Sequence, residues 1–586
     1  DGSPNDAALD GSMLPEPPMP MVLAPAEDGE SLPASQPRPI APTPAEEPVV
    51  GSNNWAVAGA LTANGAALVA NDMHLGTRLP NTWYRARLIV RPADGSAEPA
   101  LDIVGATLPG TPMMVVGSNG RVAWGFTNSY IDTADAVIVE RAGSDDLYQT
   151  PTGPQPYRLH REQICGRFRC ETLEVRETIW GPVIGEDLLG RTIAMRWTAH
   201  EPEAVRLAPA LALERAGSVV EAVELAQRSA IPQQNFVVGV RDGAIAWTIM
   251  GQVPDRFGFD GRDPTSFADG TRGWRGTLAA EAVPVVKTPE DGRIWTANTR
   301  VLGGEVAALL GNGGWDHGGR AGRIRDLLRA QERFAPRDFL AIQLDDRSTV
   351  HDWWRERLLE ELRARPRERA FADMIAPVEQ WDGRTLPDSV GARLVTRFRE
   401  IVRNRVYAGF MGGSPDGPFR RTYAPSQSEG PLRRLLEARP GALVPEGYES
   451  WERLIDDALG ELAGEVRSSA GGRIERFTWG QVNRPGVGHP LAQFVPLLRF
   501  WTDPENVAVP GGRAAVRAQA PGFGASQRMA VSPGHEAEGL FHMPGGQAGN
   551  PLSPYYLAGH ADWVEGRPTP LLPGPARWTL RLRPVA

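Results

Sequence analysis

The sequence contains almost no lysine. Lys287 is its only lysine, so arginine carries nearly all of the positive charge. No serine lies three residues before Lys287, which excludes a serine–lysine nucleophile pair of the S-x-x-K type. Acidic residues outnumber basic ones, giving a net charge of −9 and a pI near 5.7. We therefore do not expect nucleic acid to be the main partner of this chain.

Long apolar segments are missing as well. No apolar run approaches the roughly eighteen residues that a membrane-spanning helix needs, so we expect no membrane span. The chain begins with Asp1 rather than with Met and a basic segment. Any signal peptide is therefore expected to have been removed or to lie outside this sequence.

Two common hydrolase signatures are absent. The sequence has no G-x-S-x-G motif, in which the nucleophile of many Ser-His-Asp hydrolases lies, so a hydrolase of that kind would need another reactive serine. It also has no H-E-x-x-H motif. Five further histidines show no spacing typical of zinc ligands, namely His317, His351, His535, His542 and His560. A zinc hydrolase is therefore disfavoured.

Cysteine is scarce, with Cys165 and Cys170 as the only two. They are spaced like the two sides of a short hairpin, between Ile164 and the strand-like residues 172–175. This spacing favours a structural disulfide in an oxidising compartment, which predicts a periplasmic or secreted protein. Two free thiols are the alternative. A zinc site is not expected, because no second pair of ligands is visible.

The 586 residues exceed one ordinary domain, and 41% apolar and 23% charged residues are values typical of globular proteins. Residues 1–51 are rich in proline and acidic residues and nearly free of aromatics. Such a segment does not bury enough apolar surface to order itself alone. We interpret residues 1–51 as a spacer or the tail of an upstream segment, and 52–586 as the folded region.

The folded region shows hairpins first and helices later. Residues 55–70 read as two strands around the turn Asn64-Gly65, and further hairpins are expected within 113–125 and 236–249. Ser218 to Glu221 has the pattern of a helix capping box. Helical periodicity dominates from about 320 to 470, and short strands are expected after Gly471. The order predicts an α+β fold with a mainly helical insertion.

The dipeptide Gly51-Ser52 lies where the spacer meets the first expected strand. We interpret Ser52 as a nucleophile that becomes the amino terminus of the working enzyme once the Gly51–Ser52 bond is cut. An amino-terminal serine carries its own base, since its α-amine can take the hydroxyl proton directly or through a water. Glycine at position 51 tolerates the strained backbone that an internal attack needs. A Gly-Ser linker before a strand is the alternative.

Six short motifs follow one another along the sequence. They are Gly51–Trp55, Ala70–Leu75, Gly117–Gly125, Thr296–Asn298, Gly318–Arg320 and His542–Gln547. Together and in this order they resemble the β-subunit region of the penicillin acylase family, which includes penicillin G, cephalosporin and acyl-homoserine lactone acylases. The resemblance extends from Gly51 to about Leu580 and implies an N-terminal nucleophile hydrolase with a four-layer αββα core, made as a precursor that cuts itself.

The resemblance implies five catalytic residues. Ser52 is the nucleophile in both self-cleavage and amide hydrolysis. Arg320 places a fixed cation near the α-amine and lowers its pKa, since a nearby positive charge disfavours the ammonium form. His74 orients the substrate near the amine. The side chain of Asn298 and the backbone N–H of Asn128 stabilise the oxyanion, a contribution on the order of 100–1,000-fold in rate for one donor.

The resemblance also implies a structural calcium ion. Its ligands would be the carboxylates of Asp132 and Asp135 with the backbone carbonyls of Ala134 and Pro254, because calcium takes oxygen ligands. A glutamate ligand of the family belongs to the segment upstream of residue 1. A further family aspartate does not align, and Glu305 is the nearest candidate. A solvated acidic loop is the alternative.

We therefore expect a self-processing amidohydrolase that cleaves the linear amide of an N-acylated substrate through an acyl-enzyme on Ser52. A β-lactam side chain or an acyl-homoserine lactone would be the substrate, the α segment of the same precursor the partner, and no organic cofactor would be needed. The alternative function is a non-catalytic, secreted, calcium-stabilised binding protein that retains the fold.

Overall fold

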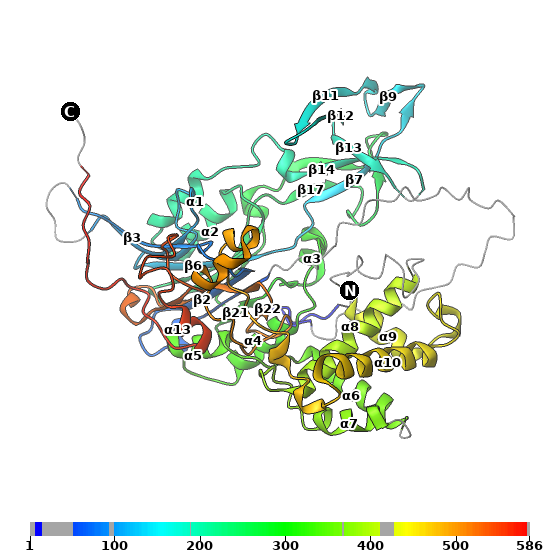
Figure 1. Cartoon of the computed structure of the whole chain (residues 1–586). Coiled ribbons are helices and arrows are strands. Elements are labelled where there is room, and N and C mark those ends of the chain that lie inside the picture. Colours follow the sequence, from blue (N-terminus) through cyan, green and yellow to red (C-terminus); the bar gives the residue numbers. More distant parts are fainter. Residues whose placement is uncertain are drawn as a thin grey trace.

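Two facing β-sheets form the centre of the molecule in the computed structural model (Figure 1). The structure describes residues 6–14, 51–92, 99–187, 189–365, 369–410 and 427–582. The first sheet has the strand order β21-β1-β2-β23-β22, with β24 paired to β23. Its strands are β1 (Gly51–Val57), β2 (Leu68–Gly76), β21 (Arg293–Thr296), β22 (Gln519–Ala520), β23 (Phe523–Val531) and β24 (Leu540–His542).

The second sheet packs face to face against the first and contains the second and third expected hairpins. Its strand order is β20-β16-β15-β6-β5-β4-β3. The strands are β3 (Tyr84–Val90), β4 (Leu101–Thr107), β5 (Val116–Ser118), β6 (Val122–Asn128), β15 (Gln234–Val240), β16 (Ile245–Met250) and β20 (Val285–Lys287).

Glycines allow the two sheets to approach closely. A Cβ on Gly125 of β6 would lie 2.7 Å from Asn54 Nδ2 in β1, and one on Gly239 of β15 would lie 2.8 Å from Ala67 Cβ. These distances are shorter than normal contacts, so a larger residue would push the sheets apart. The strand β1, with all seven residues buried, is held between this interface and the helices behind it.

Helices cover the outer faces of both sheets. On the second sheet these are α1 (Ala208–Ala212) and α2 (Val219–Arg228), and on the first sheet α4 (Gly319–Arg329) and α5 (Pro336–Gln343). The resulting αββα order is the expected four-layer α+β core. The capping box of α2 differs in one detail, since the Glu221 carboxylate accepts from the N–H of Gly217 while Ser218 Oγ accepts from Glu221 N.

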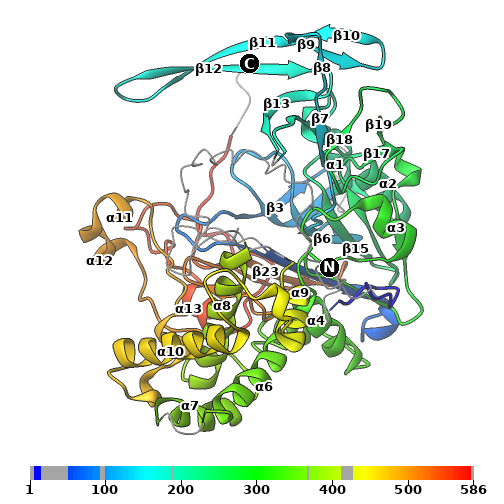
Figure 2. The same cartoon turned by 90° about the vertical axis from the view of Figure 1, so that its right-hand side faces the viewer.

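The helical insertion has its own hydrophobic core, which includes the buried side chains of Trp354, Phe398 and Trp451. It is built from α6 (Val350–Arg363), α7 (Arg369–Glu379), α8 (Val390–Phe410), α9 (Glu429–Ala438) and α10 (Trp451–Ala470), which lie together beside the sheets (Figure 2). The expected helical run from about 320 to 470 therefore divides in two, because α4 and α5 belong to the core layers.

The chain after Gly471 does not return directly to strands, as we had expected. The short helices α11 (Leu491–Phe494) and α12 (Arg499–Thr502) come first, and strands begin again only at Gln519. Five prolines lie in this stretch, namely Pro485, Pro490, Pro496, Pro504 and Pro510. Proline lacks the N–H that a sheet ladder needs, which explains why no strand forms there. The last helix is α13 (His560–Glu565).

A second β-region projects from the core (Figure 1). Its main sheet has the order β11-β12-β13-β14-β7-β18. The strands of this region are β7 (Ala134–Ile138), β8 (Arg141–Ala142), β9 (Ser144–Thr150), β10 (Gly153–Pro156), β11 (Arg158–Cys165), β12 (Cys170–Thr178), β13 (Gly181–Glu186), β14 (Thr192–Trp197), β17 (Pro254–Phe257), β18 (Thr265–Ser266) and β19 (Gly273–Thr277). The helix α3 (Gly304–Leu310) follows β21.

Part of the expected spacer packs onto the core. Within residues 6–14, Ala7 is buried and its carbonyl accepts a hydrogen bond of 2.8 Å from Trp295 Nε1. Asp6 forms a buried ion pair with Arg300. Residues 15–50 lie outside the described part of the chain, so the spacer interpretation stays a prediction for them.

Among the described residues, no helix has both the length and the apolar character that crossing a membrane would require.

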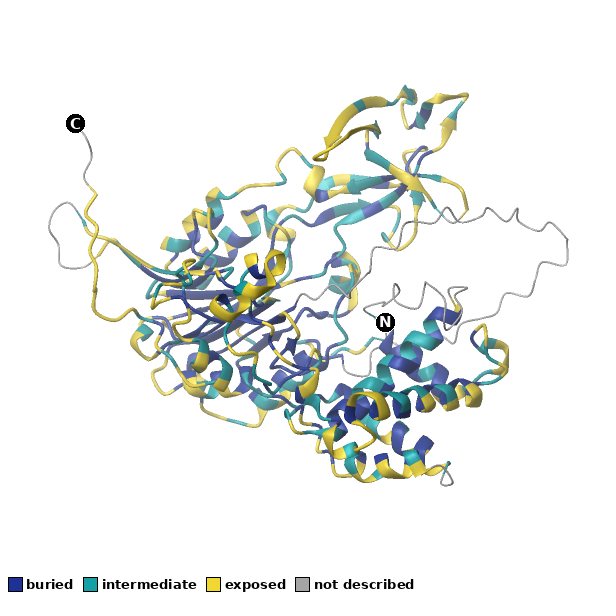
Figure 3. Cartoon of the chain, in the orientation of Figure 1, coloured by how far each residue is buried: buried dark blue, intermediate teal, exposed yellow. Residues whose placement is uncertain are grey.

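Cys165 and Cys170 are joined by a disulfide bond at the tip of the hairpin β11–β12. Figure 3 shows this hairpin largely exposed. A bond across five residues contributes about 2 kcal/mol by loop closure, and here it acts on the hairpin alone. We predict that replacing both cysteines by serine changes the midpoint of thermal unfolding by less than about 2 °C. Calorimetry with limited proteolysis of the hairpin checks this, and a loss of cooperative unfolding would contradict it.

Candidate active site

Ser52 lies near the start of β1, which is next to the edge strand β21 in the first sheet. The first residues of β1 pair with β2, so that Gly51 faces His74 and Ser52 faces Met73. On the other side β21 pairs only with the later part of β1, from Asn54 on. Beyond the end of that ladder, the N–H of Ser52 donates to a side chain instead.

That side chain is the amide of Asn298, whose Oδ1 lies 2.7 Å from Ser52 N. In this continuous chain Ser52 N is a peptide nitrogen, and it is the atom that cleavage would convert into the α-amine. The Ser52 hydroxyl donates to the carbonyl oxygen of Gly51 at 2.5 Å. Both functional groups of the serine are therefore close to the bond that we expect to be cut.

Asn298 is fixed by contacts at both ends of its amide. Its Oδ1 also accepts from Arg320 Nη2 at 2.9 Å, and its Nδ2 donates to the carbonyl of Asn128 at 3.0 Å. Two donors at one end and a carbonyl at the other determine the orientation of the amide. The backbone of Asn298 has φ of 67°, a left-handed conformation that asparagine tolerates better than most residues. The second N–H on Nδ2 stays available for another acceptor.

Arg320 is buried at the start of α4 and donates to four oxygens. They are Ser52 O at 2.8 Å, Asn53 Oδ1 at 2.7 Å, Asn298 Oδ1 at 2.9 Å and Asp316 Oδ2 at 2.7 Å. A cation at a helix amino terminus is disfavoured by the helix dipole, and the carboxylate of Asp316 offsets this.

Asp316 is a site residue that the sequence did not reveal. Its position four residues before Arg320 is the only signal that points to it. Against the desolvation that burial imposes, His317 and Arg320 lower the pKa of Asp316 from 3.8 to about 2. In the sequence, Asp316 also lies between Asn298 and Arg320. Glu305 is the nearest candidate for the further family aspartate, and it is exposed on α3.

His74 is fully buried beside the same bond. Its Nε2 lies 2.6 Å from Asp72 Oδ2, and its Nδ1 has no hydrogen-bond partner among the residues that the structure describes. Burial lowers the pKa of His74 despite the neighbouring Asp72 carboxylate, so the ring is neutral. With Nε2–H donating to the carboxylate, Nδ1 carries a lone pair. A Cβ on Gly51 would lie 3.1 Å from this Nδ1. Among the hydrogen bonds of the described residues, none joins His74 to Ser52.

A cavity of about 770 Å³ opens beside these residues. Gly51, His74, Asn298 and Arg320 form one wall. The opposite wall contains residues of the helical insertion together with residues from 479–483 and 512–523. Several residues of that second wall were not predicted to be functional, because no local pattern marks them. They include Ser348, His351, Arg393, Arg397 and Trp479.

His351 is the clearest polar group in the second wall. Its Nδ1 lies 2.7 Å from Ser348 Oγ, and its Nε2 is buried without a partner in the part of the chain that the structure describes. Burial, together with the charge of Arg399, lowers the pKa of His351 to about 3, so the imidazole is neutral. It offers the cavity an uncharged hydrogen-bonding group.

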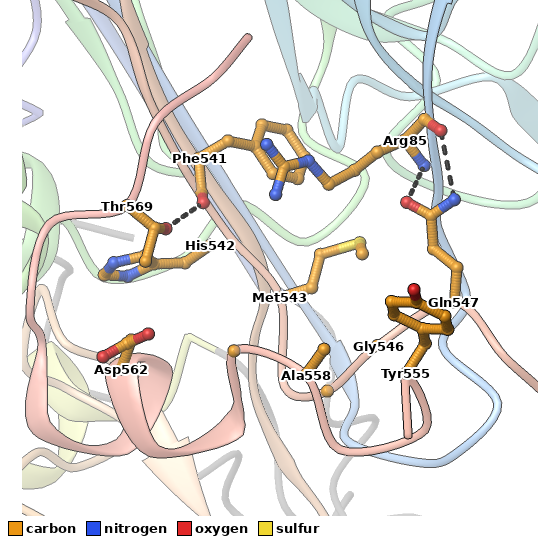
Figure 4. A pocket seen from close by; sticks show the side chains of 12 residues that line it. Arg85, Phe541, His542, Met543, Gly546, Gln547, Tyr555, Ala558, Asp562 and Thr569 are labelled. Carbon is orange, nitrogen blue, oxygen red and sulfur yellow. Dashed lines mark hydrogen bonds between the residues drawn. The ribbon is translucent and has the colours of Figure 1, made fainter. Parts of the chain in front are cut away.

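The motif His542–Gln547 lies in a different cavity of about 500 Å³ (Figure 4). Gln547 closes onto β3, accepting from Arg85 N at 3.0 Å and donating to Arg85 O at 3.1 Å. His542 lies 2.6 Å from the carbonyl of Arg567 through Nε2. None of the five predicted catalytic residues lines this cavity, so the motif supports the fold rather than the chemistry.

The expected calcium ligands are close together but have another partner. Asp132 precedes β7, Ala134 and Asp135 begin it, and Pro254 begins β17. The side chain of Arg256 lies against both aspartates. Its Nη2 is 3.1 Å from Asp132 Oδ2, and its Nε is 2.8 Å from Asp135 Oδ2. Burial raises the pKa of Asp132 to about 6, against the effect of Arg256. The described residues contain no group of three or more His, Cys, Asp or Glu arranged to hold a metal ion.

The pair Asp316–Arg320 gives a testable pH dependence. Because the folded-state pKa of Asp316 lies below its ordinary value, the carboxylate stabilises the fold above pH 4, and this is lost as the pH falls toward 2. The full contribution is on the order of 2 kcal/mol. We predict that Asp316→Asn lowers the unfolding free energy by about this amount at pH 6 and by about half of it at pH 3. Denaturant unfolding at both values checks this.

The exposed Asp388 provides the matched control, since Asp388→Asn should follow the wild-type curve at both pH values. An Asp316→Asn curve parallel to wild type would contradict the prediction.

Comparison with known families matches residues 7–578 to the family described as penicillin amidase. The chain is 27% identical over 546 residues to the penicillin acylase 2 proenzyme of Pseudomonas sp. strain SE83, covering 89% of this chain and 67% of that protein. It is 24% identical over 581 residues to the acyl-homoserine lactone acylase QuiP of Pseudomonas aeruginosa, covering 89% and 66%. The chain thus spans about two thirds of the length of these relatives.

Among solved structures, a thermostable penicillin G acylase from Alcaligenes faecalis superimposes with a TM-score of 0.65 at 18% identity. The match covers 91% of this chain and all of that chain, which confirms the expected fold. The names of the relatives are those of acylases, so they bear out the expected enzyme class, an amide-hydrolysing acylase. Because the family match extends over nearly the whole sequence, the chain belongs to the penicillin amidase family.

Proposed function

We propose that this chain is the nucleophile-bearing part of a self-processing amidohydrolase, with Ser52 as its nucleophile. One observation carries the proposal. The hydroxyl of Ser52 donates to Gly51 O, and its nitrogen donates to Asn298 Oδ1, which Arg320 also holds. The two groups that must react, the hydroxyl and the future amine, are thus both held in place.

Self-cleavage would begin with attack of Ser52 Oγ on the carbonyl carbon of Gly51. The hydroxyl proton passes to the departing nitrogen, and the peptide becomes an ester between Gly51 and Ser52. This acyl shift already leaves Ser52 with a free α-amine. Water then hydrolyses the ester, which releases the carboxylate of Gly51 and restores the Ser52 hydroxyl. Cleavage thus supplies the base that an amino-terminal serine needs.

Glycine is favoured at position 51 by space rather than by backbone strain. Gly51 is not among the glycines with positive φ, so its backbone is open to other residues. A Cβ there, however, would lie 3.1 Å from His74 Nδ1 and 3.5 Å from Arg320 Nη2. A side chain at this position would crowd both groups at the cleavage site.

Amide hydrolysis would use the same atoms a second time. The Ser52 amine takes the proton of Oγ as Oγ attacks the acyl carbonyl, and it returns that proton to the leaving amine. The free N–H of Asn298 Nδ2 and the backbone N–H of Asn128 hold the oxyanion. Water then releases the acid from the acyl-enzyme. Arg320 favours the neutral amine, although Asp316 cancels part of its charge.

The substrate would be an N-acylated compound that enters the cavity beside Gly51. The relatives are named as acylases of penicillin and of acyl-homoserine lactones, and we propose a substrate of one of these two types. The upstream α segment would be the partner of this chain. The disulfide supports a periplasmic or secreted location, where such bonds persist.

Cleavage of the Gly51–Ser52 bond can be tested directly. Protein purified from the natural full-length precursor should contain a fragment that begins Ser52-Asn53-Asn54-Trp55, and Ser52→Ala should abolish both this cleavage and amidase activity. Intact mass and amino-terminal sequencing check it. The exposed Ser468 is the matched control, since Ser468→Ala should process normally. An uncut Gly51–Ser52 bond in active wild-type protein would overturn the proposal, and in inactive protein it would favour the binding-protein alternative.

The proposed role of Asn298 in stabilising the oxyanion can be tested by kinetics. We expect Asn298→Ala to lower kcat on the order of 100–1,000-fold, because it removes a side-chain donor that stabilises the tetrahedral intermediate. KM should change much less. The measurement is steady-state hydrolysis of an N-acyl substrate by processed enzyme, with the amount of free Ser52 amino terminus determined separately. A loss explained entirely by failed processing would count against a role in the oxyanion hole.

A further inference from the structure

The segment that leaves β6 after Asn128 connects the proposed oxyanion donor to the projecting sheet. It turns at Tyr130, which has φ of 47°, and the N–H of Asp132 donates to Leu310 O at 2.9 Å. Three residues later Asp135 is buried in β7. Two carboxylates therefore lie in a poorly hydrated place directly behind the site, and they need a cation.

Arg256 provides a positive charge at this place. Its Nε donates to Asp135 Oδ2 at 2.8 Å, and its Nη2 lies 3.1 Å from Asp132 Oδ2. Both Nη atoms also donate to the backbone carbonyl of Asp132 at 3.3 Å. The side chains are 8%, 3% and 17% exposed for Arg256, Asp135 and Asp132, so the group is shielded from water.

The surroundings fit a guanidinium closely. The ring of Trp274 lies 5.7 Å from the guanidinium carbon, and its Nε1 donates to Asp135 Oδ2 at 2.5 Å. A Cβ on Gly261 would lie 2.9 Å from both Arg256 Nε and Asp132 Oδ2. Strand pairing between β17 and β19 holds Arg256 opposite Trp274. The guanidinium of Arg256 is therefore closely packed on several sides.

The same geometry does not fit the expected calcium ion. Calcium takes about six to eight oxygens, but Asp135 Oδ2, Asp132 Oδ2 and the Asp132 carbonyl already face Arg256. Within the described part of the chain, Asp135 Oδ1 is the one buried carboxylate oxygen of this pair without a partner. An ion placed there would have one unengaged carboxylate oxygen and would lie beside a guanidinium of the same charge sign.

We infer that Arg256 replaces the calcium ion in this chain, so that its guanidinium neutralises Asp132 and Asp135 and fixes the segment behind Asn128 without a metal. An arginine is charged at every relevant pH and is part of the chain. The segment would therefore be held equally well at low calcium concentration. The inference concerns this support alone and does not depend on Ser52 being the nucleophile.

The deciding experiment uses the wild-type enzyme processed from its full-length precursor. We expect less than one calcium per chain by elemental analysis, and a melting temperature that changes by less than about 1 °C between excess chelator and 5 mM calcium. The chelator strips any bound calcium, so the comparison reports directly on whether the fold needs it. A stoichiometric calcium ion lost in the Asp132→Asn variant would overturn the inference. Calcium that persists in the Asp132→Asn variant is bound at another place in the protein, and such a result is consistent with the inference.

Variants at Arg256 test whether its charge is what matters. Arg256→Met keeps most of the volume and removes the charge, and we expect it to lower the melting temperature on the order of 5 °C, with partial recovery on adding calcium. Arg256→Lys should lose less than Arg256→Met. Arg275→Met is the matched control, because Arg275 is exposed on β19 and should have no effect. Equal melting temperatures for Arg256→Met and wild type would contradict a role for the charge.

Discussion

The candidate site depends on one buried oxygen, Oδ1 of Asn298. It accepts from Ser52 N and from Arg320 Nη2, and so joins the first strand of the core to the first turn of α4. A buried hydrogen bond to a charged group contributes about 1.5–3 kcal/mol, and leaving its partners unpaired costs a similar amount again. Arg320 makes three further bonds from the same position. The serine, the asparagine and the arginine are therefore held as one unit, in which no member moves alone.

This unit can exist only because the layers of the core are close together. Gly125 and Gly239 let the second sheet approach β1 and β2, and that approach brings the end of β6, with Asn128, within reach of Asn298. The outer helix layer supplies Arg320 from the opposite side. The site thus lies where two sheets and one helix meet, and the αββα order of the core is what brings Asn128, Asn298 and the buried cation of Arg320 together.

The rest of the molecule determines what can reach the site and how firmly its edges are held. The helical insertion has a separate core, and it contributes His351 and several arginines to the far wall of the cavity. The projecting sheet is tied to the segment behind Asn128 through Arg256 and two aspartates. The far wall of the cavity and the support of the segment behind Asn128 therefore depend on regions outside the αββα core.

Sequence patterns predicted much of the fold. Strand alternation and turn residues located the hairpins, and the resemblance of the ordered motifs to a known family pointed to Ser52, Asn298 and Arg320, which the structure brings together. Asp316, His351 and Arg256 escaped prediction. Arg256 meets Asp135 across 121 positions, and no local pattern records where a long side chain will end. The sequence by itself determined the three hairpins of the two central sheets, the helical character of the insertion and the placement of Gly51-Ser52 at the start of β1. Only the tertiary structure decided which charges meet, since burial forces each one to find a partner that packing brings near.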